Sequence, residues 1–187
     1  MPDQLELIGL VIGSTSLILG VYAIILHYYI PDKLELYAKD NPFEDATVAN
    51  GQPPATNRFY HLTVRNNHKN AMAKNCKPYL ISMRKIEGKE LVSTPIPLKW
   101  RGFPTSIVDI NPKKEQRFDA FHISLGNTLP ISFNAYIDST AMIPIANFPG
   151  EYEAIYRVTS DNFKTKEGSF IITLSVNTVE VNLRQKV

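Results

Sequence analysis

The chain opens with one long apolar segment and continues in short segments where apolar and polar residues alternate. No Asp, Glu, Lys or Arg occurs between Leu7 and Ile30. A helix over those residues would be roughly 36 Å long, which is enough to cross a hydrocarbon core about 30 Å thick. Two adjacent tyrosines near its end suit the lipid headgroup layer. The pattern predicts one transmembrane helix over Leu5–Ile30, preceded by a short tail over residues 1–4.

A cleaved signal peptide is the alternative for this segment. The tail before it is acidic, however, and the apolar stretch is longer than the core of a signal peptide. Lys33, Lys39 and Arg58 follow the segment, whereas no Lys or Arg precedes it. Since positively charged flanks stay on the cytoplasmic side, we expect a single-pass protein of the cell membrane with its domain in the cytoplasm.

Small residues recur along one face of the predicted helix, at spacings of four and three residues. Small side chains let a second helix backbone approach closely, so this face predicts a helix–helix interface and a homo-oligomer formed through it. The alternative is that glycine and alanine are simply frequent in membrane helices. The residues of the predicted interface are Gly9, Gly13, Ser16, Gly20 and Ala23.

Residues 31–57 are predicted to hold a first strand and a proline-rich linker. Leu34 and Leu36 alternate with polar residues after Pro31, which predicts a strand. Asn41–Asn57 then contains three prolines, a glycine and several Asn, Asp and Thr residues without any period. This composition is typical of a loop and predicts a moderately stiff linker.

Alternation with a period of two dominates residues 58–187, where we expect seven to nine strands and no helix. Within Glu115–Ile123 the apolar residues change phase, as they do at a β-bulge. Pro97 confines its short segment to a sheet edge. The other predicted strands lie in Phe59–Asn66, Tyr79–Ile86, Ile96–Trp100, Ile107–Ile110, Ile131–Ile137, Tyr152–Val158, Phe170–Val176 and Val179–Leu183.

Short strands with one apolar face each, separated by turns, favour two packed antiparallel sheets. The expected fold class is all-β: an immunoglobulin-like antiparallel β-sandwich over residues 58–187, preceded by the N-terminal transmembrane helix. Trp100 and several phenylalanines and tyrosines would fill the core. Pro149–Tyr152, at the start of a long strand, is similar to the segment before the last two strands of such domains, where Tyr152 would make a corner contact.

Five short motifs follow one another in the first half of this region. They are Leu62–Asn66, Ala73–Cys76, Pro97–Trp100, Asp109–Pro112 and Arg117–Phe121. In this order they resemble a group of uncharacterised prokaryotic single-pass membrane proteins with an immunoglobulin-like β-sandwich domain. The resemblance implies this architecture and brings no activity with it.

Residues able to carry catalysis or bind a metal are few and dispersed. The single cysteine, Cys76, has no base at a spacing that implies contact, so we expect a small buried hydrophobe rather than a nucleophile. The four histidines lack the paired spacing of metal ligands, although His61 and His122 could meet across two strands. We therefore expect no catalytic residues, no metal site and no cofactor, and the protein is not expected to be an enzyme.

Charged residues change this picture little. The formal net charge is +2, and the basic residues are scattered along the chain, which predicts no patch for nucleic acid or anionic lipid. Glu151 and Glu153 lie two apart on one strand, as on a solvated face. We expect Asp109, Asp119 and Arg117 to form a structural ion-pair cluster near a strand end.

Two classes of function remain open. The first is a membrane-anchored protein-interaction or scaffold module, a subunit of a membrane complex whose partners are the lipid bilayer and an unknown protein. The small-residue helix face and the apolar edge after Val179 favour it. The second is a membrane-tethered sensor or receptor domain that binds a small ligand or glycan, for which Phe103 and Phe163 are the candidate loop aromatics.

Overall fold

The structure, a computed structural model, describes residues 18–21, 31–48, 55–88, 90–125, 132–134, 140–142, 149–174 and 181–186. The chain divides into two compact units, Met1–Pro31 and Asp32–Val187. In the first unit, residues 18–21 form a helical turn. Among the described residues no helix is long and apolar enough to span a bilayer, and most of the predicted transmembrane helix lies outside them.

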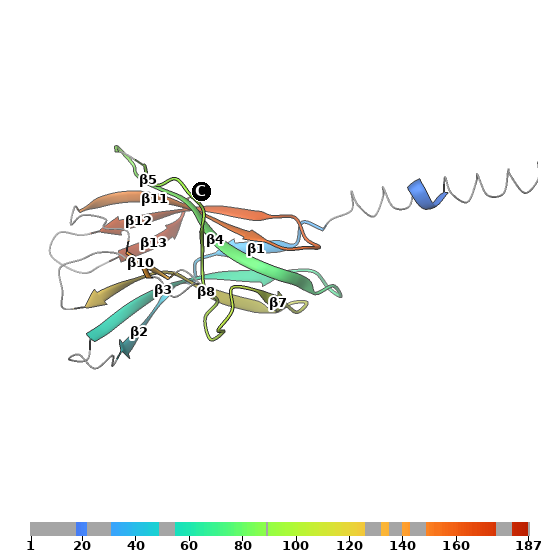
Figure 1. The fold of residues 1–187 in the computed structure, drawn as a ribbon, viewed down its shortest axis with the longest axis horizontal. Coiled ribbons are helices and arrows are strands. Elements are labelled where there is room, and N and C mark those ends of the chain that lie inside the picture. Colours follow the sequence, from blue (N-terminus) through green and yellow to red (C-terminus); the bar gives the residue numbers. More distant parts are fainter. Residues whose placement is uncertain are drawn as a thin grey trace, which may run out of the picture. The chain divides into compact units, whose positions relative to one another are not determined.

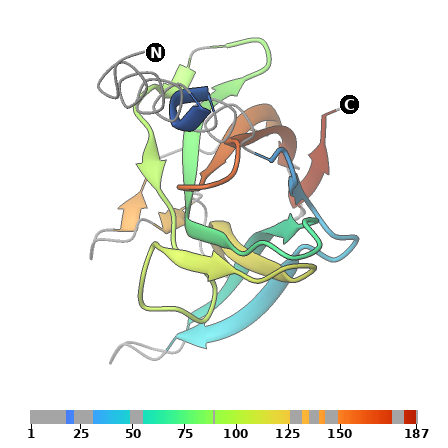
Figure 2. The same cartoon turned by 90° about the vertical axis from the view of Figure 1, so that its right-hand side faces the viewer.

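The second unit is all-β, as the alternating pattern predicts, and its strands form two antiparallel sheets consistent with a sandwich (Figure 1). The first sheet contains β1 (Leu34–Tyr37), β2 (Phe43–Val48), β3 (Ala55–Asn66), β8 (Glu115–Leu125), β9 (Ser132–Asn134) and β10 (Thr140–Met142). The second contains β4 (Ala73–Lys85), β5 (Glu90–Val92), β6 (Ile96–Pro97), β7 (Val108–Ile110), β11 (Gly150–Thr159), β12 (Lys166–Leu174) and β13 (Val181–Gln185). Viewed along the strands, β2, β3 and β8 (cyan, teal and yellow) face β11 and β12 (orange to red) in Figure 2.

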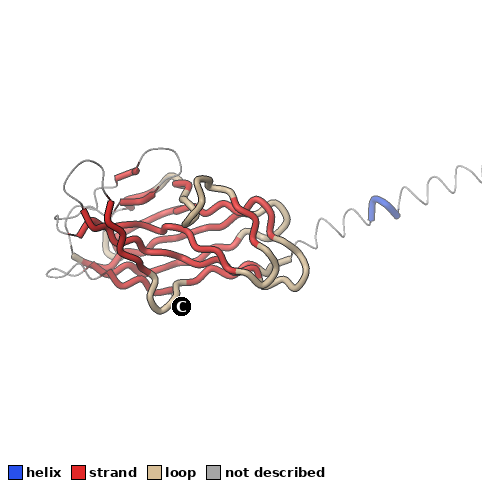
Figure 3. The backbone as a smooth tube through the Cα atoms, turned by 90° about the horizontal axis from the view of Figure 1, so that it is seen from below, coloured by secondary structure: helices blue, strands red, loops and turns tan. Residues whose placement is uncertain are grey.

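The described part of the chain therefore holds thirteen strands, and eleven of them, β3 to β13, correspond to the region where seven to nine were expected. Several of the additional strands have only two or three residues, too few to show alternation. Strand and short loop make up nearly all of the described domain in Figure 3.

The expected linker over Asn41–Asn57 is wrong in part, because β2 lies within it. Both β1 and β2 pair with β3 in the same antiparallel direction, so they are two halves of one interrupted edge strand. Arg58 of β3 binds β2, the second half of this edge strand. Its guanidinium donates hydrogen bonds to both carboxylate oxygens of Asp45, at 2.7 and 2.9 Å, and lies 4.5 Å from the ring centre of Phe43. Since the described residues of β2 are mostly exposed, they show no alternation of apolar and polar residues from which a strand could be predicted.

The phase change in Glu115–Ile123 is a β-bulge, as predicted. Tyr60 of β3 pairs with Phe121 of β8, whereas the next residue, His61, pairs with Asp119. The extra residue on β8 shifts the register by one, so the apolar residues on both sides of it point into the core. A second bulge lies in β4, between its pairs with Ile155 and Tyr156 of β11.

Trp100 lies where the chain changes sheets. The two residues of β6 pair with β4 in the second sheet, and Trp100 then forms a bridge with Phe118 in the first. The indole is fully buried, packs edge-to-face on Phe118 at 5.7 Å, and donates from Nε1 to the carbonyl oxygens of Cys76 and Ser106, each at 3.1 Å. The buried indole of Trp100, which the sequence predicts to lie in the core, thus contacts residues of both sheets.

Tyr156 is the one large core side chain whose polar atom lacks a hydrogen bond in the described residues. It is fully buried between Phe118 and Phe170, and its hydroxyl has no hydrogen-bond partner among the residues that the structure describes. Burial raises the pKa of this hydroxyl. A buried donor without an acceptor is costly, because it has lost its hydrogen bonds to water.

We therefore expect Tyr156→Phe to leave the free energy of unfolding unchanged or to raise it by about 1 kcal/mol. Tyr60→Phe is the matched control, because the buried Tyr60 hydroxyl interacts with Arg58 and its loss should destabilise. Urea unfolding followed by circular dichroism measures both. If Tyr156→Phe costs more than Tyr60→Phe, the hydroxyl of Tyr156 has a partner after all.

Candidate interaction surfaces

The predicted helix–helix interface is represented in the described residues by Gly20 alone. Gly9, Gly13, Ser16 and Ala23 lie outside them. Gly20 sits in the exposed helical turn, and a Cβ added there would meet none of the described atoms within 4 Å. The helix–helix interface stays a prediction.

Glu153 is buried in an ion-pair network on the outer face of the second sheet, so its expected solvated setting is wrong. Its side chain accepts from Arg84 at 2.7 Å, Lys186 at 2.9 Å and Ser169 at 2.8 Å, and the residue is 8 % exposed. Arg84 lies on β4 and Ser169 on β12, the two strands that border β11, and Lys186 directly follows β13, which pairs with β12. Glu151, two residues earlier, is exposed and pairs with Arg184 at 3.1 Å.

A second carboxylate, Glu115, is held in the same way on the first sheet. It accepts from Lys39 at 2.6 Å and Tyr37 at 2.7 Å and pairs with Arg65. Hydrogen bonds from Lys39, Tyr37 and Arg65 lower the pKa of Glu115 to about 2. Burial and the hydrogen bond to Glu115 raise the pKa of Tyr37 to about 12. This cluster joins β1, β3 and β8 across the edge of the sheet.

These carboxylates make stability depend on pH. Hydrogen bonds from Lys186, Arg84 and Ser169 lower the pKa of Glu153 from its ordinary 4.5 to about 2. A carboxyl group whose pKa is lowered by folding stabilises the folded state at pH values above its ordinary pKa. This contribution is lost as the pH falls through the pKa that the group has in the folded state. The domain should therefore lose stability between pH 4.5 and about 2.

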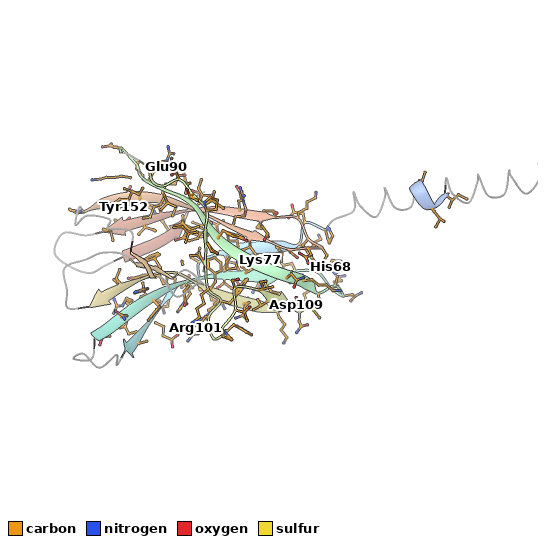
Figure 4. All side chains as sticks on the ribbon, viewed as in Figure 1. His68, Lys77, Glu90, Arg101, Asp109 and Tyr152 are labelled. Carbon is orange, nitrogen blue, oxygen red and sulfur yellow. The ribbon has the colours of Figure 1, made fainter. Side chains whose placement is uncertain are left out.

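We expect Glu153→Gln to weaken this acid dependence, since a neutral amide cannot titrate. The effect should be modest, because Arg84 and Lys186 are themselves half exposed and screened by water. Unfolding midpoints in urea across that pH range measure it. Glu90→Gln is the control: Glu90 is exposed on β5 (Figure 4), and its replacement should leave the acid dependence as it is.

His61 is the one buried histidine among the described residues. It is 5 % exposed, its Nδ1 lies 3.0 Å from Oδ1 of Asp119, and its Nε2 lies 3.9 Å from Oε2 of Glu44. Neither ring nitrogen makes a well-aligned hydrogen bond. Arg101 pairs with Glu44. A substrate would have to displace side chains to reach this imidazole.

The remaining candidates have contacts of their own. His122 lies against Phe59 in a tilted arrangement, with ring centres 5.1 Å apart. Asp109 accepts from the backbone nitrogen of Asn75 on β4, and Asp119 lies beside His61; the expected cluster with Arg117 stays a prediction. In the described ranges no three His, Cys, Asp or Glu residues are arranged to hold a metal ion.

Cys76 is a buried structural residue, as predicted. It is fully buried, and burial, the largest cause, raises the pKa of its thiol to about 11. Its Sγ lies 3.6 Å from the carbonyl oxygen of Ala73. Because a thiolate is the reactive form, this cysteine is protected from both deprotonation and contact.

The two candidate ligand-binding aromatics have different settings. Phe103 is 40 % exposed, whereas Phe163 is 3 % exposed and packs edge-on against His68 at 5.8 Å. Phe163 is therefore a core residue beneath a loop, which sequence alone could not distinguish from an exposed one.

The outer edge of β13 offers backbone groups to a partner. Within the described residues β13 pairs only with β12. Lys186 donates its backbone N–H to Ser169 at 2.8 Å, and inward and outward groups alternate along an antiparallel strand. The N–H groups of Leu183 and Gln185 consequently point away from β12. The sequence predicted an apolar edge after Val179. The structure places β13 at an edge, and the side chains described there, Arg184, Gln185 and Lys186, are polar and exposed.

Comparison with known proteins adds no relative: no family model matches the chain, and no curated protein and no solved structure is significantly similar to it.

Proposed function

We propose that this protein is a membrane-anchored β-sandwich that acts as a protein-interaction or scaffold module within a membrane complex. The observation that carries the proposal is the division of the chain at Pro31. The charge-free stretch that ends at Ile30 falls in the first unit, and a domain with its own core begins right after it. In this proposal the domain has an immunoglobulin-like arrangement. The small-residue face of the predicted helix would in addition let the protein self-associate.

The charged groups support an interaction role over catalysis. Glu153 and Glu115 are occupied by ion pairs that fasten neighbouring strands together. The outward N–H groups at the edge of β13 could in contrast pair with an extended segment of a partner protein. Arg184, Gln185 and Lys186 are exposed there, and the two basic side chains pair with Glu151 and Glu153 of the same domain.

Site-specific photo-crosslinking in intact cells tests this proposal. A photoreactive residue at Gln185 should give a discrete adduct with another protein, whereas one at Glu90, exposed on β5, should not. Gln185→Pro should abolish binding of that partner while the domain still folds, since it removes an N–H that faces outward. If neither site gives a specific adduct, the interaction role is wrong.

The alternative is a tethered sensor or receptor domain for a small ligand or glycan. It retains one exposed loop aromatic, Phe103, of the two on which it depended. A ligand that shifts the unfolding temperature of the wild type, and does not shift that of Phe103→Ala, would favour this alternative.

A further inference from the structure

Four segments distant in sequence meet at the end of the domain where the chain enters it. They are residues 31–33, the loop 67–72 between β3 and β4, the turn 111–114 between β7 and β8, and the loop 160–165 between β11 and β12. Figure 1 shows these connections together at one end, and Figure 4 marks His68 there. Backbone hydrogen bonds fix the arrangement: the N–H of Asn67 donates to the carbonyl oxygen of Lys33, and the N–H of Lys113 donates to the carbonyl oxygen of Asn66, each at 2.8 Å.

This end carries a concentration of positive charge, which we call the basic end. Asp32 and Asp161 are the acidic residues of the four segments, and Asp161 accepts a hydrogen bond from Asn75. The whole chain has a formal charge of only +2, so the remainder of the molecule is close to neutral or acidic. The five exposed lysines of the basic end are Lys33, Lys69, Lys113, Lys114 and Lys164.

The surrounding strand ends do not add to this imbalance, because their charges are mixed. Within two residues of the loops lie the basic Arg65, Lys74 and Lys166 and the acidic Glu35, Asp109, Glu115 and Glu167. An apolar side chain, Met72, is 37 % exposed in the same loop as Lys69. Lysines around an exposed apolar group are the composition that binds the headgroup and interfacial layers of an anionic bilayer.

Chain length brings these lysines close to a membrane. Only Pro31 and Asp32 separate Ile30, the end of the predicted helix, from Lys33. Three extended residues span about 10 Å, which is about the distance over which charge acts at physiological salt. Resting on the proposed membrane anchor, we propose that the basic end is a docking surface for anionic lipid headgroups, which holds the domain against the bilayer.

Fluorescence quenching on the full chain tests this inference. A fluorophore attached to Asn70→Cys reports on the basic end, and the native Cys76 is buried. The chain is reconstituted into phosphatidylcholine vesicles, with or without phosphatidylglycerol, that carry a quencher on the headgroup. We expect stronger quenching in anionic vesicles, and its reversal by added salt.

Paired lysine variants give the controls. Lys69→Gln with Lys164→Gln should weaken docking roughly twentyfold, since each lysine near an anionic surface contributes roughly fivefold. Lys77→Gln with Lys99→Gln removes the same charge elsewhere and should have little effect; Figure 4 shows Lys77 in the middle of the domain. Equal quenching in neutral and anionic vesicles, or equal losses in the two pairs, would overturn the inference and leave an acidic protein as the partner of this end.

Failure of the anchor can be told apart from failure of the docking surface. Flotation of the full chain with neutral vesicles depends on the predicted helix alone. If the full chain does not float with neutral vesicles, the proposed membrane anchor is wrong. The basic end is then tested by flotation of the chain with anionic vesicles, which the double variant of Lys69 and Lys164 should lose.

Discussion

Trp100→Ala should destabilise the domain more than any other single substitution discussed here, by ~3–5 kcal/mol. The indole is fully buried at the crossing between the sheets, so alanine leaves a large cavity. The change also removes the donor that the carbonyl oxygens of Cys76 and Ser106 share. Typical domains have total stabilities of about 5–15 kcal/mol, so a loss of this size removes much of the total.

Trp100 is the single tryptophan, so unfolding must be followed by far-ultraviolet circular dichroism rather than by indole emission. Trp100→Phe is the control, because it keeps an aromatic ring against Phe118 and loses the N–H. Its cost should be smaller than that of alanine. A Trp100→Ala protein with nearly wild-type stability would contradict a core organised on this residue.

Asn66→Ala should cost about 3 kcal/mol, because it leaves several buried groups without partners. Asn66 is fully buried at the end of β3, and its Nδ2 donates to the carbonyl oxygens of Ala71 at 2.8 Å and Ile110 at 2.9 Å. Its Oδ1 accepts from the backbone nitrogen of His68 at 2.9 Å. One side chain thus ties the loop after β3 to β7, across the basic end.

The neighbouring Asn67 provides a matched control for this prediction. Its Nδ2 donates to Glu35 at 3.0 Å on the exposed surface, so Asn67→Ala should change stability by less than about 0.5 kcal/mol. Urea unfolding of the two variants measures the difference. Similar losses for both would show that the buried bonds of Asn66 contribute little.

Alternation identified the strands whose two faces have different surroundings. In β3 the apolar Tyr60, Leu62 and Val64 are buried, although His61 and Thr63 on the other face are buried as well, and the phase change before Phe121 marked a bulge. β2 escaped this reasoning because an exposed edge strand needs no apolar face. Its place depends instead on pairing with β3 and on Arg58, which lies beyond the interrupting prolines.

Charged sites were the least predictable, because their partners are distant in sequence. Glu153 resembles a solvated residue until Arg84 and Lys186, 69 and 33 residues away, are brought beside it. The basic end is a similar case. Its lysines, from Lys33 to Lys164, are scattered in sequence and gather only because three turns fold to the same end of the sheets.

A membrane anchor that precedes an independently folded β domain underlies both proposals. Alkaline carbonate extraction tests this arrangement on membranes from cells producing either the full chain or the chain from Asp32 onward. We expect the full chain to stay in the membrane pellet and the shorter chain to be released as a folded, protease-resistant domain. Release of the full chain, or a shorter chain that is unfolded or remains in the pellet, would contradict it.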